Sequence, residues 1–197
     1  MKKIIFLLII IGCSNERGEY YFEFDKVEYY TINIDEREAA NLMCENNYRT
    51  ELEELKSGII TGNKPETIAE PEIVSALVKV GYERKLIRKR KVEKFFRERQ
   101  DTMAFTSSCW PVYRDVLIFR RRNKISGMAK ICFECEKHQI IGSELETWNF
   151  GQSEDYKLLK EELYRKRSRV GKGEFHPQTS HRTVREPLDS HGSSQSV

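Results

Sequence analysis

The sequence predicts an α+β domain with N-terminal strands, a helical middle and an antiparallel β-meander closed by a helix. Three observations support this fold class. Aromatic and β-branched residues dominate residues 19–34 and return in short runs between residues 102 and 141. Between these two regions, apolar residues recur three or four positions apart, as they do on one face of a helix. The apolar pattern ends in one more helical segment, and polar turn residues separate the segments.

The first region has the composition of β-strands. Tyr20, Phe22 and Phe24 alternate along residues 20–25, and the run from Val27 to Ile34 is rich in Tyr, Thr and Ile. Such side chains fit a pleated, half-buried surface. We therefore expect one or two strands in residues 19–34, with a hairpin turn at Asp25-Lys26 as one arrangement.

The helical middle begins at Asp35, which precedes two glutamates and an alanine-rich stretch as a capping residue would. The first helix is expected to reach about Cys44 and to resume at Arg49 to Leu55. Glycine, asparagine and proline mark residues 62–71 as a loop. Two further helices are expected on either side of Gly81, at Glu72–Val80 and Arg84–Arg99.

The second half of the chain returns to strands. Val116 to Phe119 is an apolar run, Arg121 to Lys124 is polar enough to turn, and an apolar pattern then resumes. This order predicts a short antiparallel meander that ends in a helix. The expected elements are strands at Thr102–Ser107, Arg114–Arg120, Ile125–Phe133 and His138–Ile141, and a helix at Asp155–Arg165.

The N-terminus has the pattern of a secretory signal. Met1-Lys2-Lys3 is basic, the run from Ile4 to Ile11 is entirely apolar, and Gly12-Cys13 follows. A membrane-spanning helix needs about 20 apolar residues, whereas a run of roughly 7–15 behind a basic start is typical of a signal peptide. Residues 10–13, Ile-Ile-Gly-Cys, resemble the lipobox of bacterial lipoproteins, in which the cysteine thiol receives a lipid.

This resemblance implies a signal peptide over residues 1–12, a diacylglyceryl group and fatty acids such as palmitate on Cys13, and a short polar tether over residues 13–18. Two or more acyl chains anchor a protein stably to a membrane. We therefore expect a cell-envelope protein whose partner is the membrane itself. Ser14 stands where an aspartate would resemble an inner-membrane retention signal, which favours the outer membrane. The alternative is that Ile4 to Gly12 forms a core strand behind two lysines.

A single domain is expected over residues 19–167, followed by a disordered tail over residues 168–197. The tail is rich in Gly, Ser, Pro, His and Arg and almost lacks apolar residues. The formal net charge of the whole chain is +3, but several basic residues lie in the leader and the tail. The folded body is then roughly neutral to acidic, which argues against a nucleic-acid partner.

The segment Arg84–Arg99 is an exception to this neutral balance. Five apolar residues are embedded in its charges: Leu86, Ile87, Val92, Phe95 and Phe96. Their spacing predicts one amphipathic helix with a solvated basic face. On a tethered protein, the same basic face would also suit anionic lipid headgroups or an acidic envelope partner. The sequence leaves both interpretations open.

Three of the four cysteines that remain besides Cys13 form a chemically suggestive cluster. If Arg120 pairs with Ile125 across a turn at residues 122–123, counting back along both strands places Cys109 opposite residue 136. Adjacent antiparallel strands can supply the separation of roughly 4.4–6.8 Å between Cα atoms that a disulfide requires. We therefore expect Cys109 to lie beside Cys132 and Cys135.

Three interpretations of this cluster remain open. A structural disulfide from Cys109 to Cys135 or Cys132 would persist in an exported protein, and we favour it. A zinc site would use the CxxC spacing of Cys132 and Cys135, with Cys109 and His138 as further ligands. Thioredoxin-like redox chemistry needs a helix after the CxxC, and the residues that follow Cys135 predict none of useful length. Zinc is the one cofactor that the sequence suggests.

Other residues give little reason to expect an enzyme. His176, His181 and His191 lie in the tail at irregular spacing, and Trp110 and Trp148 are expected to be packing residues rather than a binding platform. The sequence has no Ser-His-Asp order, no glycine-rich phosphate loop and no metalloprotease helix.

Residues 109–119 and 129–135 resemble uncharacterised small bacterial lipoproteins. In that family a cysteine opens one strand of a hairpin, and Ile-Cys-Phe-x-Cys, here residues 131–135, closes the other. The resemblance covers about Tyr20 to Leu163 and implies no established activity. Some family members have a histidine where this chain has Arg114-Asp115, which weakens the zinc interpretation. Two function classes follow: a tethered binding or structural module, and a thiol- or zinc-dependent envelope protein.

Overall fold

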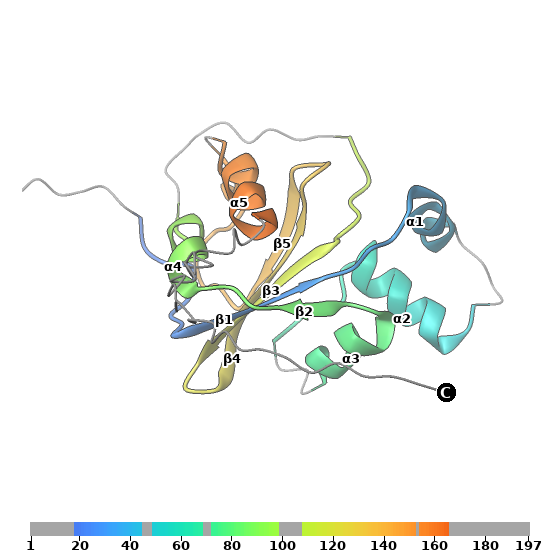
Figure 1. Cartoon of the computed structure of the whole chain (residues 1–197), viewed down its shortest axis with the longest axis horizontal. Coiled ribbons are helices and arrows are strands. Elements are labelled where there is room, and N and C mark those ends of the chain that lie inside the picture. The colour runs from blue at the N-terminus through green and yellow to red at the C-terminus, as the bar shows by residue number, and fades with distance from the viewer. Residues whose placement is uncertain (1–17, 45–48, 69–71, 99–107, 153, 166–197) are drawn as a thin grey trace, which may run out of the picture. The chain divides into compact units, whose positions relative to one another are not determined.

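An open, five-stranded antiparallel sheet with strand order β2-β1-β3-β4-β5 lies at the centre of the fold (Figure 1). The computed structural model describes residues 18–44, 49–68, 72–98, 108–152 and 154–165. These residues all fall within one unit that ends at Arg165. The predicted α+β class is confirmed. The strands are β1 (Lys26–Thr31), β2 (Glu83–Lys85), β3 (Asp115–Arg121), β4 (Lys124–Cys132) and β5 (Lys137–Ile141).

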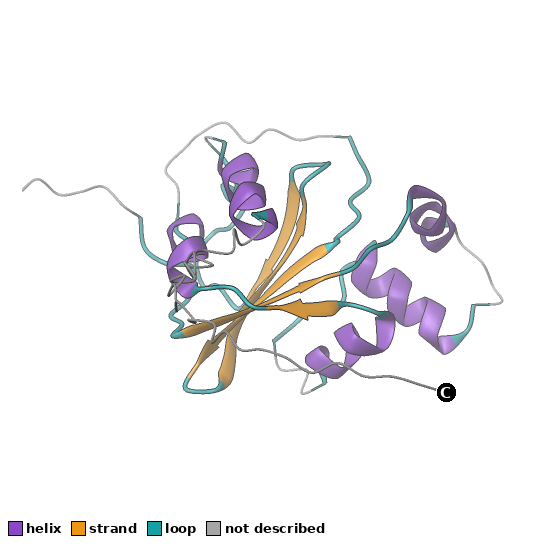
Figure 2. Cartoon of the chain, in the orientation of Figure 1, coloured by secondary structure: helices purple, strands orange, loops and turns teal. Residues whose placement is uncertain are grey.

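Helices cover both faces of this sheet (Figures 1 and 2). Three helices pack on one face: α1 (Glu36–Met43), α2 (Glu51–Ile60) and α3 (Ile73–Val80). The other face carries α4 (Lys89–Val92), the 3₁₀ turn η1 (Glu93–Phe95) and the C-terminal helix α5 (Asp155–Tyr164). Each face therefore has its own apolar core.

The helix ends follow local capping rules. The Asp35 carboxylate accepts a hydrogen bond from the Glu38 N–H, as the sequence predicts. Thr50 and Glu53 form a reciprocal capping box at the start of α2. Gly81 ends α3 with a φ of 103°, a left-handed conformation that glycine adopts without steric cost.

Strand alternation divides the core between the two faces. Val116 and Ile118 point toward α1, α2 and α3, whereas Leu117 and Phe119 point toward α4 and α5. All four side chains are fully buried. This is the alternation that the sequence predicts for this strand, and a one-residue slip would reverse it.

The β3–β4 hairpin turns at Arg122 and Asn123, which both have positive φ angles of 49° and 66°. Such a pair is typical of the tight turn that matches strand twist. Arg120 pairs with Ile125, as predicted, and a bulge next to Phe119 then shifts the register by one residue.

The predicted hairpin turn at Asp25-Lys26 is wrong. β1 pairs with β2 on one side and β3 on the other, so residues before Lys26 have no place in the sheet. Phe22 and Phe24 instead pack their rings against Phe119, at centroid distances of 4.5 and 4.8 Å. The alternation of aromatic residues marks this packing rather than a second strand.

The predicted single helix over Arg84–Arg99 is also wrong. Its first residues form β2, because the Arg84 guanidinium donates to the carboxylate of Glu28 on β1 at 3.0 Å. Glu28 is buried, and although burial raises its pKa, contacts with Lys26, Arg120 and Arg84 hold that pKa below its usual value. Leu86, at 78% exposure, is not part of an apolar stripe.

Several predictions lie outside the described residues. These are the signal and lipobox at residues 1–13, the strand at Thr102–Ser107 and the disordered tail at 168–197. In the part of the chain that the structure describes, no helix is long and apolar enough to cross a membrane.

Candidate functional site

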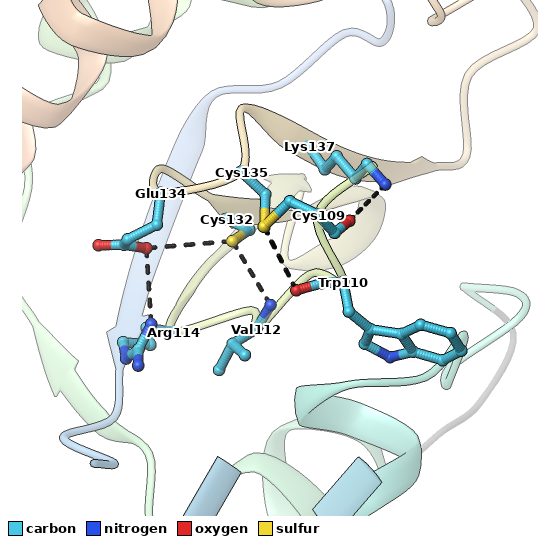
Figure 3. The surroundings of a disulfide bond; sticks show 8 residues. All are labelled: Cys109, Trp110, Val112, Arg114, Cys132, Glu134, Cys135 and Lys137. Carbon is cyan, nitrogen blue, oxygen red and sulfur yellow. Dashed lines mark hydrogen bonds and ion pairs between the residues drawn. A yellow bond between two sulfur atoms is a disulfide. The ribbon is translucent and has the colours of Figure 1, made fainter. Parts of the chain in front are cut away.

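Cys109 and Cys135 form a disulfide, with their Cα atoms 5.5 Å apart (Figure 3). The β3–β4 hairpin and the turn into β5 bring the two residues together. The Lys137 ammonium group on β5 donates to the Cys109 carbonyl at 2.5 Å. The structure thus joins two of the three cysteines that the sequence singles out.

Cys132 is a free thiol buried next to this disulfide. Its side chain clusters with Tyr113 and Cys135, and the Val112 N–H donates to its sulfur at 3.4 Å. A carboxylate oxygen of Glu134 lies 3.9 Å from the same sulfur (Figure 3). A nucleophile, a disulfide and a proton acceptor therefore meet in one cluster.

His138 points away from the cysteines. It pairs with Ile131 on the face that α5 covers, whereas Cys132 is on the opposite face. Burial lowers the pKa of His138, which favours the neutral ring. Its Nε2–H donates to the Thr147 carbonyl at 2.8 Å, and Nδ1 accepts from the Tyr156 hydroxyl at 2.7 Å. The structure therefore does not bring His138 to the three cysteines.

Lys130 lies two residues before Cys132 on the same face of β4 and is fully buried. Its ammonium group donates to the carbonyls of Ile59, Gly62 and Lys64 at 2.9, 2.7 and 2.9 Å. The Tyr113 ring lies 4.5 Å from the same nitrogen. Burial lowers the pKa of Lys130 to about 7. Since a cation is favourable at the C-terminus of a helix, Lys130 fixes the end of α2 to the sheet.

Asp115 is the buried acid on the other face of the sheet, at 1% exposure. The Tyr29 hydroxyl donates to its carboxylate at 2.5 Å, and the Tyr164 hydroxyl lies 2.9 and 3.1 Å from the two oxygens. Burial raises the pKa of Asp115, although both hydroxyl donors lower it. Tyr164 is the last residue of α5, so this contact ties that helix to β3.

A groove of about 490 Å³ lies along α5 next to this pair, lined in part by Phe133, Lys160 and Tyr164. Lys160 also pairs with Glu134 at 3.5 Å, and Arg114 pairs with the same carboxylate at 3.5 Å. The groove therefore combines aromatic surface with charges of both signs.

Sequence reasoning missed Lys130 and Asp115. The strand alternation could have predicted that both are buried, because Lys130 lies between Met128 and Cys132 on a buried face. Asp115 likewise shares a face with Leu117 and Phe119. A charged residue in such a position is almost never fully buried unless it is paired.

The prediction that Trp110 and Trp148 are packing residues is wrong, since they are 67% and 50% exposed. Cys44 is a free, exposed thiol. Cys13, His176, His181 and His191 lie outside the described residues.

Within the described ranges, no group of three or more His, Cys, Asp or Glu side chains is arranged to hold a metal ion. Comparisons with protein-family models, curated proteins and solved structures gave no match for this chain. The resemblance to small lipoproteins therefore stays a prediction.

Proposed function

We propose that this chain is a lipid-anchored protein of the bacterial cell envelope that serves as a binding or structural module. The observation that carries the proposal is the N-terminal sequence: two lysines, an apolar run and Gly12-Cys13. Lipid on Cys13 would hold the domain at a membrane without a spanning helix. Ser14 favours the outer membrane over the inner membrane.

The Cys109–Cys135 disulfide supports an exported location. Such bonds persist in oxidising environments and are rare in the reducing cytosol. The two cysteines are 26 residues apart, and closing a loop of that length stabilises a fold by about 3.5 kcal/mol in the chain-entropy description.

A binding role is supported by apolar side chains left on the surface. Trp110, Trp148 and Tyr164 are all at least 49% exposed. Aromatic side chains of this kind are enriched at protein interfaces. The basic segment Arg84–Arg99 adds a second surface, suited to an anionic envelope partner, and we propose no nucleic-acid partner.

The lipid anchor is tested by changing Cys13→Ser and feeding cells a labelled fatty acid. We expect the parent chain to carry the label and the Cys13→Ser chain to lose it and to keep its leader. Cys44→Ser is the matched control, because Cys44 is a free cysteine on the surface. Equal labelling of the parent and the Cys13→Ser chain would refute the anchor.

Cys132 favours a second candidate function, a thiol-dependent one. Its sulfur clusters with Cys135 of the disulfide. In an internal exchange, the Cys132 thiolate attacks the sulfur of Cys135, the Cys109–Cys135 bond breaks, and Cys109 leaves as a thiolate that takes up a proton. Glu134 can accept the proton of Cys132. The exchange needs no external oxidant, because one disulfide replaces another.

A zinc site on Cys109, Cys132, Cys135 and His138 is the other form of this candidate. It would require reduction of the disulfide and release of both His138 hydrogen bonds.

Acid quenching, alkylation and peptide mapping of the purified chain test the thiol candidate. Exchange predicts two disulfides in the parent, Cys109–Cys135 and Cys132–Cys135, and the first alone in the Cys132→Ser chain. A parent with Cys109–Cys135 alone would reject exchange. Metal analysis of the same sample tests the zinc form, which requires stoichiometric zinc and no disulfide.

A further inference from the structure

We propose that one face of the domain docks onto anionic lipid headgroups of the membrane that holds the anchor. We call it the tether face, because it surrounds the point where the chain from Cys13 enters the fold. The inference rests on the lipid anchor proposed above. The face comprises Tyr20, Lys89 and Arg122, which line one groove, and Arg97, which bridges to Tyr20. It also includes the exposed Arg90 and Lys94, which lie on the same short helical segment as Lys89.

The entry point of the tether is fixed on the fold. Gly18, the first described residue, accepts a hydrogen bond from the Arg97 guanidinium through its carbonyl at 3.5 Å. The Glu98 N–H donates to the Glu19 carbonyl at 2.7 Å. Tyr20 forms an antiparallel bridge with Arg97. Figure 1 shows this first segment next to α4. The domain therefore does not swing freely about Gly18.

The tether is too short to move this face far from the membrane. Cys13 and Gly18 are five residues apart, and a fully extended chain spans at most about 3.6 Å per residue, or about 18 Å here. Electrostatic attraction between a surface and a protein extends over a Debye length of about 8 Å at physiological salt. Because the extended tether is only about two Debye lengths, it lets residues next to Gly18 come within that range of the headgroups. Helix α1 lies at the opposite end of the fold in Figure 1.

The tether face combines aromatic rings with cations. A groove of about 380 Å³ is lined in part by Tyr20, Phe24, Lys89 and Arg122. The Arg97 guanidinium lies 3.7 Å from the Tyr20 ring centroid, and the Lys89 ammonium lies 4.9 Å from that of Phe24. Aromatic side chains with one polar end and long basic side chains are those that settle at a membrane–water interface.

The charge of the segment matches an anionic surface. Residues 84–98 contain eight basic and two acidic side chains. Part of this charge is neutralised, because Lys89 pairs with Glu93 and Lys91 with Glu162. Asp25 and Glu23 also line the groove; Asp25 accepts from the Arg122 N–H, and Glu23 pairs with Arg121. Among the described residues, the exposed Arg90 has no ion-pair partner. Each basic side chain near an anionic membrane favours docking about fivefold.

The test uses the full lipidated chain, purified from membranes and reconstituted into vesicles. One set contains phosphatidylcholine alone, and the other contains phosphatidylcholine with phosphatidylglycerol. Lysine acetylation read by mass spectrometry compares Lys94, on the tether face, with Lys79, an exposed lysine of α3 on the other helical layer. We expect the Lys94-to-Lys79 reactivity ratio to fall at least about fivefold on anionic vesicles and to recover at high salt.

A matched pair of charge reversals sharpens the test. Arg90→Glu should abolish most of the decrease in the Lys94-to-Lys79 reactivity ratio on anionic vesicles. The substitution changes the charge by two units, which weakens docking by roughly 25-fold. Arg37→Glu reverses an exposed arginine of α1 and should leave the fall intact.

The outcomes separate this inference from the anchor. Flotation of the vesicles by centrifugation shows whether the purified chain is bound to them. A chain that does not float with either vesicle set contradicts the lipid anchor itself. A chain that floats but keeps the same reactivity ratio on both sets overturns the tether face and leaves the anchor standing. Recognition of anionic lipid is overturned if the Lys94-to-Lys79 reactivity ratio falls equally on both vesicle sets. It is also overturned if Arg90→Glu and Arg37→Glu change that ratio equally.

Discussion

Lys130 and Asp115 are charged side chains buried on opposite faces of the sheet, and their surroundings satisfy them in different ways. Lys130 on β4 points toward α2 and donates to three backbone carbonyls. Asp115 on the neighbouring strand β3 points toward α5 and accepts from the hydroxyls of Tyr29 and Tyr164. Lys130 is closed off by the end of a helix and its loop, whereas Asp115 has one partner, Tyr164, that is half exposed.

We interpret the Lys130 contacts as structural and the Asp115 site as a candidate binding site. The carbonyl partners of Lys130 are fixed by the backbone, so the ammonium group has no route to a ligand. Tyr164 lines the groove along α5, so water or a ligand can reach the far partner of Asp115. Substitutions at Lys130 and around Asp115 test this difference.

Lys130→Met should have the largest effect. It leaves the buried Ile59 carbonyl and the part-buried carbonyls of Gly62 and Lys64 without their donor. An unsatisfied buried group costs about 1–3 kcal/mol and a part-buried one less, so we expect a loss of roughly 2–4 kcal/mol in unfolding free energy. Urea denaturation measures this loss. Lys124→Met, at an exposed position on the same strand, should change stability by less than about 0.5 kcal/mol. Similar losses in both variants would mean that Lys130 does not fix α2 to the sheet.

The pH dependence of stability should also differ between the parent and Lys130→Met. Burial lowers the pKa of Lys130 to about 7 in the folded chain, below its usual value of 10.5. The unfolded chain therefore binds more protons between these values, and stability rises with pH across that window. The parent should gain about 2 kcal/mol relative to Lys130→Met between pH 7 and pH 9. Parallel stability curves would contradict the lowered pKa.

The smallest effects concern the hydroxyls at Asp115. Tyr29→Phe removes a buried donor to a carboxylate and should cost about 2 kcal/mol. Tyr164→Phe should cost about 1 kcal/mol or less, because water can replace a hydroxyl at a half-exposed position. Thermal unfolding of the two variants side by side gives the comparison. If Tyr164→Phe were the more damaging change, the proposed accessibility of the Asp115 site would fail.

The sequence predicts the parts of this fold that local pattern determines. The β3–β4 hairpin follows from the alternation of residues 116–120 and from polar turn residues, and the pairing of Arg120 with Ile125 follows from the turn. The cysteine hairpin follows in turn, because both strand ends must meet. Asp35 likewise shows where α1 begins.

The missed features depend on partners far apart in the sequence. Arg84 lies in a strand that pairs with β1, and its guanidinium contacts Glu28, 56 residues earlier. Lys130 is satisfied by carbonyls that lie 66 to 71 residues away. A hydrophobic pattern over 84–99 that fits a helix cannot reveal such requirements, since it reports only local periodicity. Of the candidate site, the neighbouring cysteines were therefore predictable, whereas the orientation of His138 was not.

The mass of the N-terminal peptide, from the membrane fraction of cells that make the full chain, shows whether Cys13 carries a lipid. We predict a peptide that begins at Cys13 and carries the added mass of a diacylglyceryl group, with or without a third acyl chain. A peptide that begins at Met1, or one that begins at Cys13 with an unmodified thiol, would refute the lipid anchor.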